Sequence, residues 1–386
     1  MTRSPNPPNS FTQALTPASL GYRMPAEWER HEATWIAWPH NRTDWPGKFE
    51  AILWVYAEIV RNLAKAERVE VLVSDAAEER RAREVLTKSE VDVSNVRFHR
   101  WPTDRVWTRD SGPIFVRRDE PRSRKNVAPR ERVRTAGGFA SPVALTKWRF
   151  NAWAKYPDWK RDSKLPARVA ELLKLASWEP SVNINGERRP LVLEGGSIDV
   201  NGRGTLLTTE ECLLSEVQQR NPGVARAHLE QAFAEYLGIK KVLWLERGII
   251  GDDTHGHVDD IARFVGPDTV VAALEFNPTD ENYEPLHDNF RRLQKMTDQD
   301  GRPLRVVALP MPAPVIFRKQ RLPASYANFY IANGLVLVPT FNDPNDRAAL
   351  NILADLFPKR QVVGIYCRDF VWGLGAIHCM TQQQPR

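Results

Sequence analysis

The stretch Gly373-Leu374-Gly375-Ala376-Ile377-His378-Cys379-Met380 is the part around which the rest of the chain is predicted to be organised. It lies close to the end of the sequence, yet it is apolar and glycine-rich, whereas the last residues of a domain are usually polar and frayed. Glycines let the backbone pass close to a ligand, so a cysteine that follows them suits a nucleophile held in a pocket. A buried structural cysteine that closes a core strand is the alternative.

The Cys379 stretch ends the last of several repeated strand–helix–strand units. Apolar patterns predict a strand at 334–339, a helix at 346–357 and a strand at 362–366. Two earlier stretches repeat this order, with strands at 269–274 and 304–309 around a helix at 283–296, and strands at 204–208 and 241–245 around a helix at 226–237. The unit at 269–309 is followed by Asn328-Phe329-Tyr330-Ile331, in the place that the Cys379 stretch takes after the last unit.

The N-terminal half follows the same plan less regularly. Strands are predicted at 34–38 and 69–73 around a helix at 48–66, and a second unit combines a strand at 114–116, a long basic loop, a helix near 165–175 and the segment 190–197. Units that cannot bury their own faces must pack against one another, and a closed ring leaves the fewest exposed sheet edges. We therefore predict an α/β fold, a five-bladed pseudo-symmetric α/β-propeller of ββαβ-type repeats around a central site. Two ordinary α/β domains joined near residue 205 are the alternative.

Composition bounds the class of protein. The 386 residues are 42% hydrophobic and include 13 tryptophans, which is enough for a substantial core. No apolar run approaches the roughly 18 residues that cross a bilayer, and the N-terminus lacks the apolar region of a signal peptide. Residues 1–20 are predicted to be a disordered leader and residues 21–386 a single catalytic domain. Three cysteines cannot form a disulfide framework, which favours a reducing, cytoplasmic setting.

The net charge of +6 arises largely in the segment 117–134, where eight basic residues accompany three acidic ones. Nucleic-acid-binding surfaces interleave basic side chains with aromatic ones, and this segment contains no aromatic residue. We therefore expect a solvated loop inserted at about 117–134, and neither nucleic acid nor a membrane as a partner. The sequence leaves a homo-oligomer open.

Four of the five units end in polar residues that an apolar core would not select: Asp110, Glu194, the pair His257 and Asp259, and Cys379. In an extended segment, residues two apart point to the same side, about 7 Å apart along the chain. His257 and Asp259 should therefore project together. In a closed ring the equivalent ends of the units meet at the centre, so that one thiol, one imidazole and three carboxylates would share one space.

Such a cluster makes chemical sense when a cation fills it. The carboxylates repel one another and raise the pKa of the thiol, which leaves a poor nucleophile in the empty site. A planar guanidinium fits because its N–H donors match carboxylates in pairs. Asp110 and Asp259 would hold the guanidinium while the Cys379 thiolate attacks its central carbon. His257 would protonate the departing ammonia and then activate water, with Glu194 orienting the imidazole, and neither a metal nor a cofactor is needed.

Other interpretations of the same residues are open. Asp110 could be a turn or ion-pair residue, and Glu194, which precedes two glycines, could start a turn. Trp107 could stack on a cation as a substrate-binding residue, or it could pack in the core. A non-catalytic protein that binds polyamines or guanidines would keep the carboxylates and would not need the thiol or the imidazole.

A metal-dependent amidohydrolase is the remaining alternative. His255 and His257 could form a metal pair, and a hydrolytic site would need a third strong ligand from elsewhere. The candidates for this ligand are His31, His40 and His378.

Five separated motifs occur in order between about Gly21 and Pro385. They are Met24-Pro25-Ala26-Glu27-Trp28-Glu29 with His31-Glu32-Ala33-Thr34-Trp35, Trp107-Thr108-Arg109-Asp110-Ser111-Gly112-Pro113, Leu193-Glu194-Gly195-Gly196, Gly256-His257-Val258-Asp259 and Ile377-His378-Cys379-Met380-Thr381. Together they resemble the agmatine deiminases and the wider family that includes the Porphyromonas-type peptidylarginine deiminases, whose fold is the five-bladed pentein propeller.

The resemblance implies a hydrolase that acts on the C–N bonds of linear amidines. It would convert agmatine and water to N-carbamoylputrescine and ammonia, a step towards putrescine, without a cofactor. The implied roles are Cys379 as nucleophile, His257 as acid and base, Glu194 as its partner, and Asp110 and Asp259 as the carboxylates that bind the guanidinium.

Two departures from the family pattern bear on the substrate. Agmatine deiminases commonly have three glycines and an asparagine before Ile-His-Cys, where this chain has Gly373-Leu374-Gly375-Ala376, and they often have aspartate at the position of His255. Both positions flank the nucleophile or the base, so the chemistry stays in place while arginine and peptidyl-arginine stay open as substrates. An arginine substrate would need a basic residue beside the pocket to bind its α-carboxylate.

Overall fold

The chain forms small α/β sheets that share one plan. The computed structural model describes residues 15–119, 134–135, 138–139 and 141–386. In the last sheet, β19 (Tyr330–Ala332) runs antiparallel to β20 (Leu335–Thr340), and after α8 (Asn345–Leu356) the strand β21 (Gln361–Tyr366) lies parallel to β20. The run Leu335-Val336-Leu337-Val338 is buried throughout, because helices cover the faces of a parallel pair and its strands become continuously apolar.

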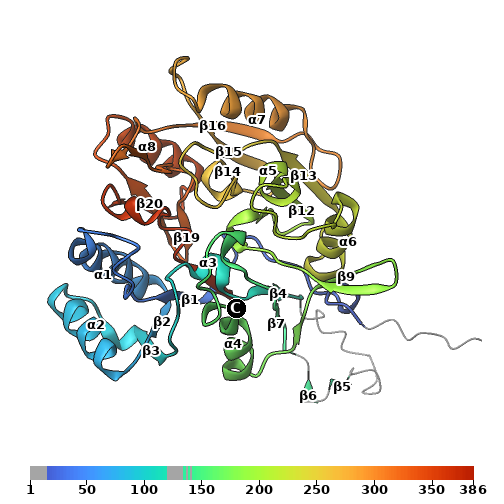
Figure 1. The fold of residues 1–386 in the computed structure, drawn as a ribbon, viewed down its shortest axis with the longest axis horizontal. Helices are drawn as coiled ribbons and strands as arrows, with labels where there is room; N and C mark the ends of the chain where they lie inside the picture. Colours follow the sequence, from blue (N-terminus) through green and yellow to red (C-terminus); the bar gives the residue numbers. More distant parts are fainter. Residues whose placement is uncertain (1–14, 120–133, 136–137, 140) are drawn as a thin grey trace, which may run out of the picture.

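Three more sheets repeat this plan (Figure 1). In each, the first strand is antiparallel to the second, and the third strand follows a helix and is parallel to the second. They consist of β4 (Ile114–Arg117), β7 (Val143–Thr146), α4 (Leu165–Leu173) and β8 (Ser177–Trp178); of β11 (Asp199–Val200), β12 (Thr205–Thr209), α6 (Arg226–Leu237) and β13 (Lys241–Leu245); and of β14 (Ala262–Phe264), β15 (Thr269–Leu274), α7 (Tyr283–Lys295) and β16 (Arg305–Pro310).

A further sheet joins the N-terminal and C-terminal parts of the chain. Its elements are β1 (His31–Ala37), α1 (Phe49–Ala66), β2 (Arg68–Val73), α2 (Ala76–Lys88), β3 (Val96–Arg100) and β22 (Gln382–Pro385). The edge position antiparallel to β1 is taken by β22, and Trp35 Nε1 donates to Gln384 Oε1 across this pair at 3.0 Å. The strand that directly follows Cys379 is therefore fixed to the first sheet.

The remaining short elements are helices and hairpins between these sheets: α3 (Thr108–Ser111), α5 (Glu210–Leu214), β5 (Arg134–Thr135) with β6 (Gly138–Phe139), β9 (Ser181–Ile184) with β10 (Glu187–Pro190), and β17 (Ile316–Phe317) with β18 (Gln320–Arg321). Among the described helices, none is both long and apolar enough to cross a bilayer.

The prediction for the second unit is wrong in one respect. The predicted strand at 114–116 is β4, an edge strand, whereas the central strand β7 is absent from the prediction. β7 has four residues, which is too short for a periodic signal. The edge strands β11 and β14, of two and three residues, escape prediction for the same reason.

The leader predicted at 1–20 lies outside the described residues up to position 14, and the prediction is wrong for its last part. Ala18–Leu20 form a short 3₁₀ helix, and the backbone oxygen of Leu15 accepts a hydrogen bond from Trp178 Nε1 at 2.9 Å. The insertion predicted at about 117–134 falls largely on 120–133, which also lie outside the described residues.

Candidate active site

The structure places the predicted site residues around one cavity of about 370 Å³. Trp107, Asp110 and Cys379 line the cavity. The other three predicted site residues lie behind Asp110 and are almost completely buried. They are Glu194, His257 and Asp259. Residues from four different sheets or their connections thus come together, although they are as far as about 270 positions apart along the chain.

Asp110 lies on α3, a short helix between β3 and β4. Its Oδ2 accepts a hydrogen bond from Trp153 Nε1, and its Oδ1 accepts one from the backbone N–H of Gly196, both at 2.9 Å. Burial raises the pKa of Asp110 to about 6, and the neighbouring carboxylates add to this rise while His257 opposes it. The two donors orient the carboxylate without neutralising it.

Gly196 is the residue that lets these groups approach one another. A Cβ atom at this position would lie 2.6 Å from His257 Nδ1, 2.8 Å from Asp110 Oδ1 and 3.0 Å from Asp259 Oδ2. No side chain fits at such distances. Close packing against the imidazole and two carboxylates therefore requires glycine at position 196.

His257 stands at the start of a 3₁₀ turn, Val258–Asp260, so the extended geometry predicted for this segment is wrong. The turn still directs both side chains to the same place, with His257 Nδ1 4.0 Å from Asp259 Oδ1 and 3.9 Å from Asp110 Oδ2. Burial lowers the pKa of His257, but the nearby Asp110, Cys212 and Glu194 outweigh burial and raise it well above its ordinary value. The imidazole is accordingly charged in the protein without substrate.

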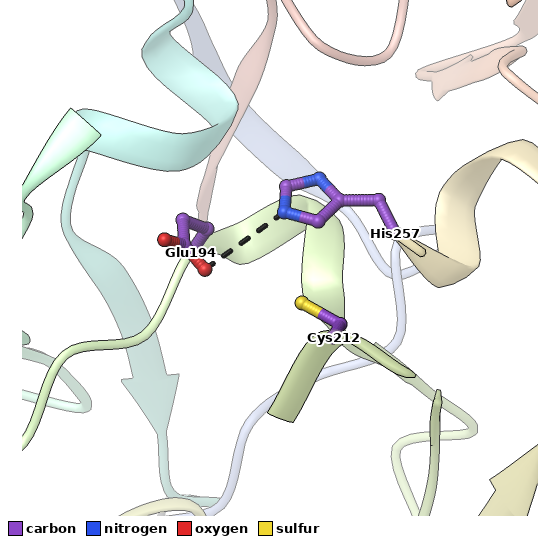
Figure 2. Close-up of side chains that lie close together, drawn as sticks. All are labelled: Glu194, Cys212 and His257. Carbon is purple, nitrogen blue, oxygen red and sulfur yellow. Dashed lines mark ion pairs between the residues drawn. The ribbon is translucent and has the colours of Figure 1, made fainter. Parts of the chain in front are cut away.

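Glu194 faces the other side of the same ring. Figure 2 shows its carboxylate directed at His257, with Glu194 Oε2 3.8 Å from His257 Nε2, and the Cys212 thiol beside the pair. Its Oε1 accepts from Arg220 Nε at 3.1 Å, and both side chains are fully buried. Burial would raise the pKa of Glu194, but Arg220 and His257 lower it to about 2. Arg220 therefore keeps Glu194 ionised, and sequence reasoning missed this residue.

Cys379 lies in a turn, not in an extended strand, and it is held by Asn328. Asn328 Nδ2 donates to Cys379 Sγ at 3.1 Å and to Asp260 Oδ1 at 2.9 Å, while Asn328 Oδ1 accepts from the His378 backbone N–H at 3.0 Å. Burial, followed by Asp259, Asp260 and Asp110, raises the pKa of Cys379 well above its ordinary value. Without substrate the site therefore holds a thiol, as the crowding argument predicts.

A chain of contacts behind the cavity fixes Asp259. Its Oδ2 lies 2.6 Å from His378 Nδ1 and 3.8 Å from Cys379 Sγ, and His378 Nε2 lies 2.8 Å from Glu27 Oε2. Hydrogen bonding and charge from His378 lower the pKa of Asp259 against the effect of burial. His378 thus contacts Asp259 and does not line the cavity.

Glu27 is the centre of a buried ionic network. Its Oε2 forms an ion pair with Arg263 NH2 at 3.0 Å and accepts a hydrogen bond from Arg109 NH2 at 3.2 Å, in addition to its contact with His378. Burial would raise the pKa of Glu27, but Arg263, His378 and Arg109 hold it well below its ordinary value. Glu27 belongs to a motif that sequence analysis singled out without giving it a role.

Trp107 lines the cavity and also packs in the aromatic core, so both predicted roles are compatible with its position. Its ring centroid lies 5.8 Å from that of Trp45. Of the two departures from the resembled family, Leu374 lines the cavity with a left-handed backbone (φ 67°), whereas His255 is half-buried and contacts Ser215. The departure at Leu374 is therefore the one that lies in the cavity wall.

Among the described residues, His255 belongs to no group of ligand-type atoms that lie close together, and His378 contacts Asp259 and Glu27. His31 contacts Glu67 and the backbone oxygen of Glu27, and both ring nitrogens of His40 face backbone oxygens. Two groups of ligand-type atoms do lie close together, Glu194 with Cys212 and His257, and Asp259 with Asp260 and Cys379. In the first group the buried guanidinium of Arg220 already supplies the positive charge, which disfavours a metal ion.

Several polar atoms at the centre of this site are buried and have no hydrogen-bond partner. They are both ring nitrogens of His257, Glu194 Oε2 and Asp259 Oδ1. Buried polar groups in folded proteins are nearly always paired, so unpaired ones at a cavity indicate a place where a ligand binds. Facing carboxylates at such a place fit a ligand with several N–H donors and a positive charge.

Comparison with known proteins agrees with this chemistry. The model of the Porphyromonas-type peptidyl-arginine deiminase family matches residues 23–385. An agmatine deiminase of Pseudomonas aeruginosa (strain LESB58) is 34% identical over 393 residues, which cover 96% of this chain and 97% of that protein. Two solved structures are similar: an agmatine deiminase of Enterococcus faecalis (TM-score 0.82, 31% identity, 97% of this chain and 98% of that one) and an agmatine deiminase of C. jejuni with substrate bound (TM-score 0.78, 27% identity, 95% and 96%).

Proposed function

This chain belongs to the Porphyromonas-type peptidyl-arginine deiminase family, and from that premise we propose that it is an agmatine deiminase. It hydrolyses the guanidinium of agmatine to N-carbamoylputrescine and ammonia, as a step of putrescine biosynthesis. The observation that carries the proposal is the juxtaposition of the Cys379 thiol with Asp259, 3.8 Å away, beside a cavity behind which Asp259 Oδ1 and both ring nitrogens of His257 have no hydrogen-bond partner. Similarity to agmatine deiminases over nearly the whole chain supports it.

We infer the following roles. Asp110 and Asp259 accept the N–H donors of the guanidinium. The bound positive charge offsets the carboxylates that raise the pKa of Cys379, so the thiol loses its proton as the substrate binds. The thiolate then forms a C–S bond to the central guanidinium carbon.

The second half of the reaction depends on His257. Its imidazolium gives a proton to the amino group that leaves as ammonia, when the C–N bond breaks and an amidino thioether on Cys379 remains. Neutral His257 then takes a proton from water, whose oxygen attacks the same carbon. The C–S bond then breaks, the remaining proton on this oxygen passes to solvent as the C=O bond forms, and the ureido product and the thiolate are released. Glu194, kept ionised by Arg220, holds the ring and stabilises its charged form.

The arrangement of sheets supports a ring. Four sheets of one plan follow the N-terminal sheet along the chain, and β22 from the C-terminal end fills the edge of this N-terminal sheet, beside β1. Such a shared sheet joins the two ends of a series of units, as a closed five-bladed propeller requires. We propose this pentein-type closure, with residues 21–386 as one catalytic domain.

The test of the function is a substrate panel. Purified protein is incubated with agmatine, arginine and a peptide ending in arginine, and ammonia and ureido products are measured with and without EDTA. We expect agmatine to be the preferred substrate and the rate to survive the chelator. Preferred turnover of arginine or of the peptide would favour one of these alternative substrates. Loss of activity in EDTA would indicate a metal-dependent amidohydrolase. Binding of guanidines without product would indicate a non-catalytic guanidine-binding protein.

A pH profile tests the role given to Asp110. With butylguanidine, which carries only the guanidinium charge, kcat/KM should fall as the pH drops below about 6. Protonation removes the negative charge of Asp110 below its pKa, which burial has raised to about 6, and kcat/KM reports pKa values of the free enzyme. In Asp110→Asn, kcat/KM should be low and should lack this step. A wild-type profile that stays flat down to pH about 4.5, near the ordinary range of carboxyl pKa values, would contradict the assignment.

The three unpaired cysteines, all buried, also support a reducing compartment. We therefore propose that the enzyme works in the cytoplasm.

A further inference from the structure

Asp44 lines the same cavity as Cys379, and one of its carboxylate oxygens accepts no hydrogen bond. Its side chain is 1% exposed, and Oδ1 accepts from Arg105 NH1 at 2.8 Å. Oδ2 is buried and has no hydrogen-bond partner. Burial accordingly raises the pKa of Asp44 to about 6 despite Arg105. A buried carboxylate oxygen without a partner costs free energy, so its place in a cavity wall points to a ligand that donates to it.

The cavity wall between Cys379 and Asp44 is aromatic. A Cβ at Gly375 would touch both Trp107 and the Cβ of Cys379, and the Trp107 ring packs on Trp45, the residue that follows Asp44. The wall therefore offers an apolar surface for a short methylene chain, with the thiol at one end and a carboxylate at the other.

The other charged groups at this end of the cavity are largely engaged. Arg105 is the basic residue beside the pocket that an arginine substrate would require, but its terminal nitrogens donate to Asp44 and to Asp158 at 2.8 and 3.2 Å. The remaining guanidinium nitrogen of Arg105, Nε, is buried and has no hydrogen-bond partner. Asp253 accepts from Lys155 and from the Tyr156 hydroxyl. The open position on Asp44 therefore favours a cationic donor over a carboxylate.

We propose that Asp44 Oδ2 binds the distal ammonium of the substrate and selects guanidines that carry a primary amine at the other end of a short chain. This inference rests on the proposed function, because it needs the guanidinium to lie beside Cys379. It gives the enzyme a preference for agmatine over alkylguanidines without a charged tail, and over arginine, whose α-carboxylate would lie beside Asp44.

The experiment compares kcat/KM for agmatine, butylguanidine and arginine in the wild type, Asp44→Asn and Asp158→Asn. The wild type should prefer agmatine over butylguanidine roughly 10- to 100-fold, the scale of one charge-assisted hydrogen bond. Asp44→Asn should lose that preference, mainly through a higher KM for agmatine, because binding common to ground and transition state acts on KM. Asp158→Asn removes a carboxylate from the same Arg105 outside the cavity wall, so it should keep the preference.

Each outcome decides something. If the wild type turns over agmatine and butylguanidine equally well, or prefers arginine, the proposal is wrong whatever the variants do. An equal loss for both substrates in Asp44→Asn, or the same loss of preference in Asp158→Asn, would also overturn it, because the effect would then be structural or a general effect of charge. A wild type inactive on every guanidine would overturn the proposed function itself. Retained butylguanidine turnover shows that Asp44→Asn is folded.

Discussion

Replacement of Cys379 by alanine is expected to lower kcat for agmatine by roughly 10⁴-fold or more, which is the scale seen when a hydrolytic enzyme loses its nucleophile. No other described thiol can take its place, because Cys212 lies beside His257 and Glu194 and Cys367 is buried in the core. The binding carboxylates stay in place, so agmatine should still bind. Ammonia release at saturating agmatine measures the change in rate, and calorimetry measures binding.

Cys367→Ala is the matched control, since it removes a fully buried thiol that lies outside the cavity wall. It should retain the wild-type kcat. A Cys379→Ala protein that keeps more than a tenth of the activity would show that the thiol does not attack the substrate.

The second large effect is expected from Glu27→Gln, through stability. The change removes the carboxylate that Arg109, Arg263 and His378 share. The side chains of Arg109 and Arg263, which are 3% and 0% exposed, then lose this negative partner. Breaking a buried ionic network in this way costs about 3–5 kcal/mol. The free energy of unfolding from urea titration at pH 7 measures the loss. Glu27 is ionised at this pH because its neighbours hold its pKa well below the ordinary value, so its stabilisation is fully present there and is lost only in acid.

Glu32→Gln is the control for this prediction. Its carboxylate pairs with Arg68 at 3.0 Å and its side chain is 40% exposed, so the change should cost no more than about 1 kcal/mol. If Glu27→Gln loses no more free energy of unfolding than Glu32→Gln, the ionic network around Glu27 does not stabilise the fold. Agmatine turnover should also fall in Glu27→Gln and not in Glu32→Gln, because His378 connects Glu27 with Asp259.

The repeated units could be predicted because each contains a long amphipathic helix between two apolar strands, and such patterns are visible in sequence. The strands β7, β11 and β14, which escaped prediction, have two to four residues, too few to show a period. The extended conformation expected at His257 and Asp259 is wrong, since a 3₁₀ turn carries them. The residues still come together, because their position at the end of a unit decides where they lie.

The supporting residues around the site were harder to predict, for different reasons. Asn328 stands where its unit ends, so the rule that found Cys379 would have found it had a neutral amide been counted. Glu27 had a motif but no chemistry that pointed to His378. Arg220 and Trp153 lie in no repeated position, and their contacts with Glu194 and Asp110 depend on how connections fold back over the site. Such contacts leave no signal in a single sequence.

The central claim is that Cys379 bonds covalently to the guanidinium carbon. Acid quenching of the wild-type enzyme during turnover of agmatine, followed by mass spectrometry of its peptides, tests this claim most directly. We expect the mass of the peptide that contains Cys379 to increase by the mass of agmatine less that of ammonia. This increase should disappear when agmatine is exhausted and should be absent from Cys379→Ala. A quenched enzyme that is turning over agmatine with Cys379 unmodified, or with the added mass on another residue, would contradict it.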